Sequence, residues 1–202
     1  NHSACAVIED DHDNIVETWY DATILTSSHK AEGSDCPDQK TTLDYNLTVR
    51  EILDFATTVA YEDIEFILES RTLNLALAHE GLKGCYGLKV GYAINLEDNK
   101  EVFGGDFLSY AMALTAAASD ARMAGCTLAA MSNSGSGNQG ITVTMPVIAY
   151  SIKYGTDDER LARALVLSHL IAIHIKGYLG KLSALCGCVI ASTGSSCGLV
   201  YL

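Results

Sequence analysis

Basic residues are scarce in this chain of 202 residues. Lysine and arginine together number 13, against 25 aspartates and glutamates, and the formal net charge is −12. Nucleic acids and anionic membrane surfaces bind proteins through clusters of lysine and arginine, so we expect neither as a partner. The imbalance lies in residues 1–105, with 20 acidic and 7 basic side chains, whereas residues 106–202 are nearly balanced.

A signal-peptide pattern and a regular cysteine framework are also missing. The seven cysteines are odd in number and widely spaced, which argues against a secreted disulfide scaffold. We therefore expect reduced thiols and a cytoplasmic protein. The uncharged segment 182–202 is long enough to raise the question of a membrane span. It holds five hydroxyl residues and three glycines with no positive cluster after it, so we expect a buried pair of small-residue helices instead.

Composition and patterning predict a mainly α (α+β) fold. With 49% hydrophobic and 19% charged residues, the chain is long enough to bury a substantial core. Two β-rich runs flank the polar insert 9–14 and predict a hairpin. We expect residues 1–45 to form a β-rich N-terminal portion with an exposed connection, and residues 46–202 to form a multi-helix core domain.

Helical spacing of apolar residues predicts most of the second portion. Thr48 and Glu51 suit a capping box, and so do Thr156 and Glu159. Residues 88–96 fit either a strand or a helix. The expected buried side of the second helix consists of Ile64, Ile67, Leu68, Leu73, Leu75 and Leu77. The predicted helices cover residues 49–60, 62–81, 107–123, 140–154 with a possible kink at Pro146, and 161–175.

The most distinctive stretch is the uncharged run from Met131 to Gly140, which combines glycines, hydroxyls and side-chain amides ahead of an apolar segment. A loop of this kind at a helix start turns backbone N–H groups toward one point, where the helix dipole favours an anion. The run lacks the lysine ending of a P-loop and the acidic partner of a dinucleotide fingerprint, which favours a carboxylate over a nucleotide phosphate. The alternative is a flexible connection between two core helices. The candidate binding residues are Ser134, Gly135, Ser136, Gly137, Asn138 and Gln139.

The densest thiol group is Cys186-Gly-Cys188, followed by Cys197. Thiolates are the preferred ligands of iron–sulfur clusters, and three of them would leave a fourth iron open to substrate. The spacing matches neither ferredoxins nor zinc ribbons, and free buried cysteines are the alternative. Lys176 suits either a substrate carboxylate or compensation of charge at a helix C-terminus.

Three histidines remain open to interpretation. His169 and His174 are five residues apart and do not share one helix face as an i, i+4 pair would, so we expect core or interface histidines rather than a metal pair. His12 lies with Asn14 in the polar insert of the hairpin, where a histidine is usually only solvated.

Three segments together resemble the cysteine desulfidase branch of the serine dehydratase alpha-chain family. They are Ser134–Ile141, Ile175–Gly187 and, more weakly, His12-x-Asn14-Ile-Val16. The resemblance implies a mainly helical fold with a 4Fe-4S cluster in which one iron is not bound by protein. It implies Cys186 as a cluster ligand, the glycine loop beside an amino-acid substrate, and His12 and Asn14 as substrate contacts.

The chain also departs from the family pattern. Two further cluster cysteines of the family lie well downstream of the Cys-Gly motif, and the N-terminal portion with a proposed catalytic cysteine has no counterpart here. We therefore expect an internal part of a longer polypeptide, with Cys188 and Cys197 as core thiols and no complete cluster on this chain alone.

The resemblance predicts a lyase that removes hydrogen sulfide from L-cysteine, or water from L-serine, with the open iron as Lewis acid. Pyruvate and ammonia would be the other products. The sequence identifies no catalytic base. The alternative function is a non-catalytic amino-acid-binding module or an inactive fragment of such an enzyme, and we expect a homodimer.

Overall fold

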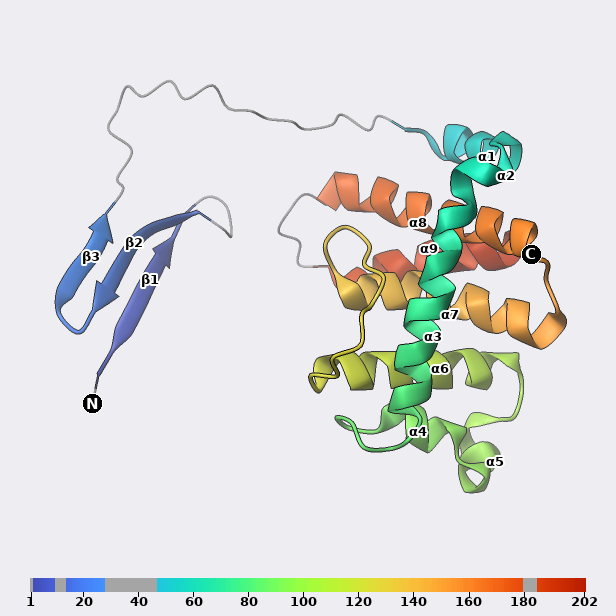
Figure 1. Ribbon diagram of the computed structural model, residues 1–202, viewed down its shortest axis with the longest axis horizontal. Helices are drawn as coiled ribbons and strands as arrows, with labels where there is room; N and C mark the ends of the chain where they lie inside the picture. Colours follow the sequence, from blue (N-terminus) through green and yellow to red (C-terminus); the bar gives the residue numbers. More distant parts are fainter. Residues whose placement is uncertain (1, 10–13, 28–46, 180–184) are drawn as a thin grey trace. The chain divides into compact units, whose positions relative to one another are not determined.

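The structure is a computed structural model that describes residues 2–9, 14–27, 47–179 and 185–202. The chain divides into two compact units. One comprises Asn1–Tyr45 with Leu179–Ala184, and the other comprises Asn46–Tyr178 with Leu185–Leu202. The prediction of a mainly helical protein with a small β portion is confirmed (Figure 1).

The first unit contains an antiparallel sheet in the order β1-β2-β3. Its strands are β1 (Ala4–Ile8), β2 (Ile15–Tyr20) and β3 (Thr23–Ser27). The predicted hairpin is β1–β2, and β3 is an additional strand that the sequence analysis does not predict. A two-residue connection through Asp21, which has a positive φ of 52°, turns the chain back from β2. Strand β3 then pairs antiparallel with β2.

The helical unit begins with α1 (Val49–Thr58), α2 (Tyr61–Ile64), the 3-10 turn η1 (Glu65–Leu68) and α3 (Glu69–Gly81). The capping box is confirmed, since Thr48 accepts from the Glu51 N–H at 3.2 Å while Glu51 accepts from the Thr48 N–H at 2.7 Å. The continuous helix expected over 62–81 is wrong, because the chain changes direction through η1. Among its expected buried residues, Ile64, Ile67 and Leu77 are buried, but Leu68, Leu73 and Leu75 are only half-buried.

Helices α4 (Val90–Asn95), η2 (Glu97–Asn99), α5 (Lys100–Phe103) and α6 (Phe107–Met123) follow. The ambiguous segment 88–96 is therefore helical over most of its length. Helix α6 matches its predicted bounds. It starts because the Asp106 side chain accepts from the Ser109 N–H at 3.1 Å, and it stops just before Gly125, whose φ is 86°.

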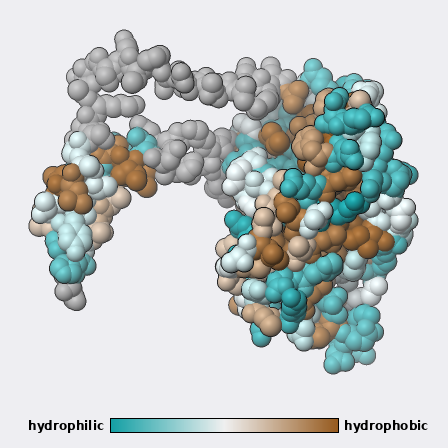
Figure 2. Space-filling model, in the orientation of Figure 1, coloured by the Kyte–Doolittle hydropathy of each residue, from teal (hydrophilic) through white to brown (hydrophobic). Residues whose placement is uncertain are grey.

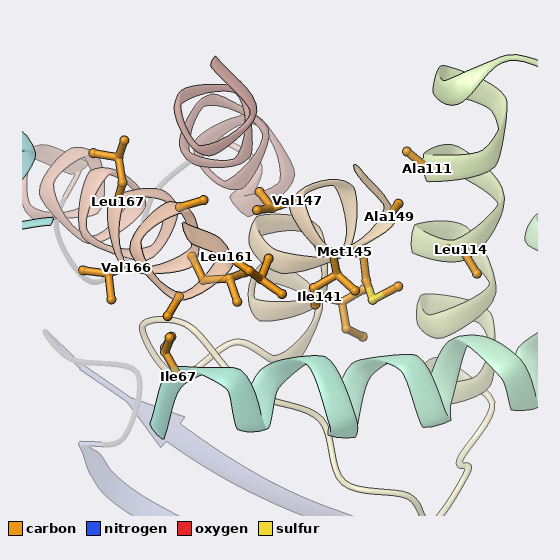
Figure 3. Close-up of a cluster of buried hydrophobic side chains, with 14 of the residues drawn as sticks. Ile67, Ala111, Leu114, Ile141, Met145, Val147, Ala149, Leu161, Val166 and Leu167 are labelled. Atoms are coloured by element: carbon orange, nitrogen blue, oxygen red, sulfur yellow. The ribbon is translucent and has the colours of Figure 1, made fainter. Parts of the chain in front are cut away.

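The core lies around α7 (Gly137–Tyr154), which packs with α6, α8 (Asp158–Leu179) and α9 (Gly187–Tyr201). Figure 3 shows apolar side chains of α7, including Ile141, Met145 and Val147, converging with Leu161 of α8 and Leu114 of α6. Helix α3 crosses α6 and α7 (Figure 1). Buried faces from at least four helices therefore meet at α7, which explains why residues 141, 143–145 and 147–149 are fully buried.

Two helix starts differ from the sequence prediction. Helix α7 begins at Gly137 rather than Gly140, because Ser136 caps it by accepting from the Gln139 N–H at 3.3 Å. At α8, the expected cap by Thr156 is wrong. The Asp157 carboxylate accepts from the Arg160 N–H at 2.9 Å, and aspartate is a better cap than threonine.

The expected helix pair in residues 182–202 is a single helix, α9, over the described part of that segment. Its small residues do permit the expected close approach, since Gly194 lies directly against the backbone carbonyl of Ser168 on α8. Within the described ranges, no helix is both long and apolar enough to cross a membrane. The face of the helical unit in Figure 2 carries hydrophobic side chains among hydrophilic ones.

Candidate functional site

The glycine-rich loop forms a tight turn from Asn133 to Ser136. The two residues exchange backbone hydrogen bonds, from Asn133 N to Ser136 O at 3.1 Å and from Ser136 N to Asn133 O at 3.0 Å. Ser134 and Gly135 between them both have positive φ angles, 49° and 78°. That conformation is uncommon for a residue with a side chain and concentrates at functional sites. The loop is therefore a defined turn rather than a flexible connection.

The loop delivers the chain into the first turn of α7. In this helix the N–H groups of Gly137, Asn138 and Gln139 precede the first intrahelical bond, which Gly140 N donates to Ser136 O at 3.0 Å. Ser136 satisfies only the N–H of Gln139. The remaining N–H groups carry the positive end of an 18-residue helix dipole, with no acidic residue in the first turn. This helix start is chemically suited to an anion.

Arg122, near the C-terminus of α6, is a candidate site residue that the sequence reading missed. Its guanidinium donates to the Asn138 side-chain oxygen at 3.2 Å. It also lies so close to Gly137 that a Cβ there would be 2.2 Å from the Arg122 Nε. The absence of a side chain at Gly137 thus allows the exposed Arg122 guanidinium to pack against the first turn of α7. The only hint in the sequence is that Arg122 lies in the last turn of the predicted helix 107–123, the helix that precedes the loop.

Asn74, fully buried on α3, anchors the beginning of the loop. Its side-chain oxygen accepts from the Met131 N–H at 3.0 Å, and its side-chain nitrogen donates to the Thr144 hydroxyl at 2.7 Å. Gly140 allows this approach, because a Cβ there would lie 1.9 Å from the Met131 carbonyl oxygen. Backbone, not a movable side chain, blocks any larger residue at position 140.

Asn133 anchors the other end of the loop from within a buried network. Its side-chain nitrogen contacts the His169 Nδ1 at 2.9 Å and the His169 carbonyl at 3.3 Å. Its side-chain oxygen accepts from the Gln139 amide at 2.6 Å and from the Ser134 hydroxyl at 3.1 Å. Four polar groups from the loop, α7 and α8 therefore depend on one buried amide.

His169 is a core histidine, as expected. Burial lowers its pKa from 6.5 to about 4, so the ring is neutral near pH 7. When Asn133 donates to Nδ1, the ring proton lies on Nε2. Nε2 is buried without a hydrogen-bond partner among the described residues. The neutral ring serves as an acceptor that holds Asn133.

The N-terminus of α9 lies beside the start of α7. The Gln139 side-chain oxygen would be 3.0 Å from a Cβ at Gly187, and Cys186, which precedes α9, is exposed. Because the Gln139 amide donates to Asn133, this side chain supports the loop instead of presenting its N–H groups to a ligand. The structure thus brings Cys186 to the same end of α7 as the glycine loop.

The expectation that Cys188 is a core thiol is wrong, because this residue is exposed on the first turn of α9. Partial shielding of its sulfur from water nevertheless raises the thiol pKa, the neighbouring Cys186 thiol raises the pKa further, and the Thr142 hydroxyl lowers it. The two thiols are therefore neighbours alongside α7. Cys197 is half-buried against the core. In the portion of the chain that the structure describes, no group of three or more histidine, cysteine or acidic side chains is arranged to hold a metal.

Three other residues were predicted to contact the substrate. Lys176 is half-buried in the last turns of α8. Asn14 belongs to the β-sheet unit, where its side chain donates to the Glu9 carbonyl at 2.9 Å and closes the β1–β2 hairpin. His12 lies outside the described residues.

Comparisons with known proteins show the family of the chain. The family described as "Serine dehydratase alpha chain" matches residues 9–202. A UPF0597 protein of Oleidesulfovibrio alaskensis is 47% identical over 201 residues, which cover 100% of this chain and 46% of the relative. The UPF0597 protein YhaM of Shigella boydii is 46% identical over 201 residues, 98% of this chain and 46% of the relative. The chain thus spans about half the length of the curated relatives it matches. No solved structure matches.

Proposed function

Because this chain belongs to the serine dehydratase alpha chain family, we propose that it contributes the amino-acid-binding site of a lyase acting on L-cysteine or L-serine. The reaction is an α,β-elimination. A base removes the Cα proton, the β-substituent leaves as sulfide or hydroxide, and the resulting aminoacrylate is hydrolysed to pyruvate and ammonia. The base is not assigned.

The observation that supports this proposal is the combination of the α7 N-terminus with Arg122. The free N–H groups of Gly137 and Asn138 and the guanidinium offer donors to a carboxylate from two directions. Arg122 donates to the Asn138 side-chain oxygen at 3.2 Å, which leaves the side-chain nitrogen of Asn138 as a further donor for the ligand. An α-carboxylate held in this way would place the Cα and Cβ of the amino acid above the loop, in a defined orientation.

The cofactor is part of the proposal. A 4Fe-4S cluster with one open iron would supply a Lewis acid for the leaving group. The described residues fit such a cluster only in part, since Cys186 is exposed beside the α7 start but no three-ligand group is present among them. We therefore assign one ligand, Cys186, to this chain. The same observation favours a second candidate function, in which the chain binds an amino acid without catalysis.

Calorimetry with L-cysteine and L-serine, under reducing and metal-free conditions, tests the binding site. Arg122→Gln should weaken binding by about tenfold or more, the loss expected for one charge-assisted contact. Arg50→Gln is the matched control, because Arg50 is exposed on α1. Equal binding by the Arg122→Gln variant and the unmodified chain would remove the basis of the proposal.

Activity is tested on a full-length polypeptide that carries this sequence, reconstituted anaerobically with iron and sulfide. Pyruvate formation from either amino acid supports the lyase. Binding without turnover, and without the cluster absorption, favours the non-catalytic module. The homodimer stays a prediction, which sedimentation of the same sample tests.

A further inference from the structure

A cavity of about 490 Å³ lies at the opposite end of the α6–α7 pair from the glycine loop. The two helices are antiparallel. Arg122 meets Asn138 at one end, and Phe107 packs on Tyr150 at the other, with ring centroids 5.6 Å apart. Lys153, which lines the cavity, is separated from Asn138 by about 22 Å at ~1.5 Å of helix rise per residue. This cavity is not part of the loop site.

Three of the residues that line the cavity are buried, and most of the others are polar or charged. Ile94 of α4 and Ala113 of α6 are 7% and 1% exposed, and Ser109 is 6% exposed. The Ser109 hydroxyl already donates to the Phe103 carbonyl. The volume is within the range of ~300–1,000 Å³ typical of small-molecule sites, which combine an apolar lining with a few polar groups.

Four charged side chains line the cavity. Two are negative, Glu97 and Asp106, and two are positive, Lys100 and Lys153. Lys100 forms an ion pair with Glu97. Asp106 uses one oxygen to cap α6 at Ser109. The hydrogen bond from the Ser109 N–H is the main cause that lowers the pKa of this carboxyl group, and the positive charge of Lys153 adds a smaller effect. Nevertheless, no salt bridge of 4 Å or less joins Lys153 to Asp106 within the described residues. These two opposite charges line one cavity without direct contact.

We propose that this cavity binds a small zwitterion of the α-amino-acid class, with its carboxylate on Lys153 and its ammonium group on Asp106. A zwitterion bridges the two unlinked charges and leaves neither uncompensated. A phosphate or a dicarboxylate would face repulsion from Glu97 and Asp106, and a simple cation would face repulsion from Lys100 and Lys153. The aliphatic part of the ligand contacts Ile94 and Ala113. This site does not depend on the proposed lyase activity.

The test uses L-alanine, which carries both charges but has no β-substituent to eliminate. Titration of the isotopically labelled chain, up to roughly 10 mM to cover millimolar affinity, should shift the backbone amide resonances of Gly104, Gly105 and Ser109. L-lactate lacks the ammonium group and isopropylamine lacks the carboxylate. Each should therefore bind at least about tenfold more weakly than L-alanine. Binding of lactate or inorganic phosphate as tight as that of L-alanine would overturn the assignment, and so would L-alanine shifts confined to the glycine loop.

Two variants separate binding from folding. Lys153→Met removes the exposed cation, and Asp106→Asn removes the negative charge but keeps a residue that caps helices equally well. Each should weaken L-alanine binding at the cavity about tenfold with little change in thermal unfolding. Arg122→Gln should leave the cavity resonances responsive, which distinguishes failure of this site from failure of the loop site. Unchanged L-alanine affinity in both cavity variants refutes the proposal.

Discussion

The buried histidine behind the glycine loop predicts a specific pH dependence of stability. His169 is 8% exposed, and burial lowers its pKa from 6.5 to about 4. Between these two pH values, His169 is protonated in the unfolded chain and remains neutral in the folded chain. The stability that the neutral His169 ring contributes is therefore fully present above pH 6.5 and is lost as the pH falls toward 4. Each pH unit in this interval lowers the free energy of unfolding by ~1.4 kcal/mol, so the full loss is about 3 kcal/mol.

Urea unfolding at pH values from 7.5 down to 4.5 measures this loss. His169→Gln should flatten the dependence, because a glutamine oxygen can accept from the Asn133 amide but does not titrate. The variant is expected to be less stable than the unmodified chain at pH 7.5 and closer to it at pH 5. Comparison of the two proteins removes contributions that they share, including those of the carboxylates whose pKa values are lowered.

His174→Gln is the matched control, since His174 is half-buried on the same helix and packs edge-on against Tyr178. This variant should retain the pH dependence of the unmodified chain. If His169→Gln shows the same slope between pH 6.5 and 5 as the unmodified chain, His169 is not the neutral group that holds Asn133, and the account of the loop's second anchor is wrong.

Three further predictions concern the supports of the site. Gly140→Ala should lower stability by about 2 kcal/mol or more despite alanine's better helix propensity, because the new methyl group meets the Met131 carbonyl. In the control Gly177→Ala in α8, the new methyl group meets nothing within 4 Å, so this change should raise stability by up to ~1 kcal/mol. Chemical denaturation compares the two variants, and equal effects would contradict the steric argument. Asn74→Ala should lower the free energy of unfolding by about 2–4 kcal/mol. A double-mutant cycle with Thr144→Val should give a coupling energy of roughly 1 kcal/mol. Additive effects of the two changes would mean that the 2.7 Å hydrogen bond between these side chains contributes nothing to stability. Asp157→Ala should lower the thermal stability of α8 by about 1 kcal/mol while Asp157→Asn is nearly neutral; equal losses would argue against a capping role.

Local patterns predicted most of the helices and the first hairpin. Helix α6 was predicted with correct bounds because its signals are contained in the sequence around it: an aspartate before the first turn and a glycine after the last. The helix expected over 62–81 was wrong at η1 and on its buried side. Leucine spacing suggested that Leu73 and Leu75 face the core, but Asn74 occupies the buried position, and apolar periodicity cannot anticipate a buried amide.

The candidate site shows the same division between local and distant information. The glycine loop could be singled out from composition, because its turn and its helix start are formed by adjacent residues. Its supports could not. Asn74 contacts residues 57 and 70 positions away, and His169 is 36 positions from Asn133. Only the packing of α3 and α8 on α7 brings these side chains to the loop.

Those distant supports also explain how a loop rich in glycine would hold the ligand that we propose for it. A glycine-rich segment loses more conformational entropy on ordering than other sequences, and a binding site that orders only when the ligand arrives loses affinity. Here Asn74 and Asn133 order the loop when the core forms, at the cost of two buried amides that must be fully hydrogen-bonded. Variants at either asparagine should therefore weaken amino-acid binding even where the chain still folds. Arg122→Gln, by contrast, should weaken binding and leave stability nearly unchanged, because in the proposed site the exposed guanidinium contacts the ligand and is not one of the buried supports of the loop.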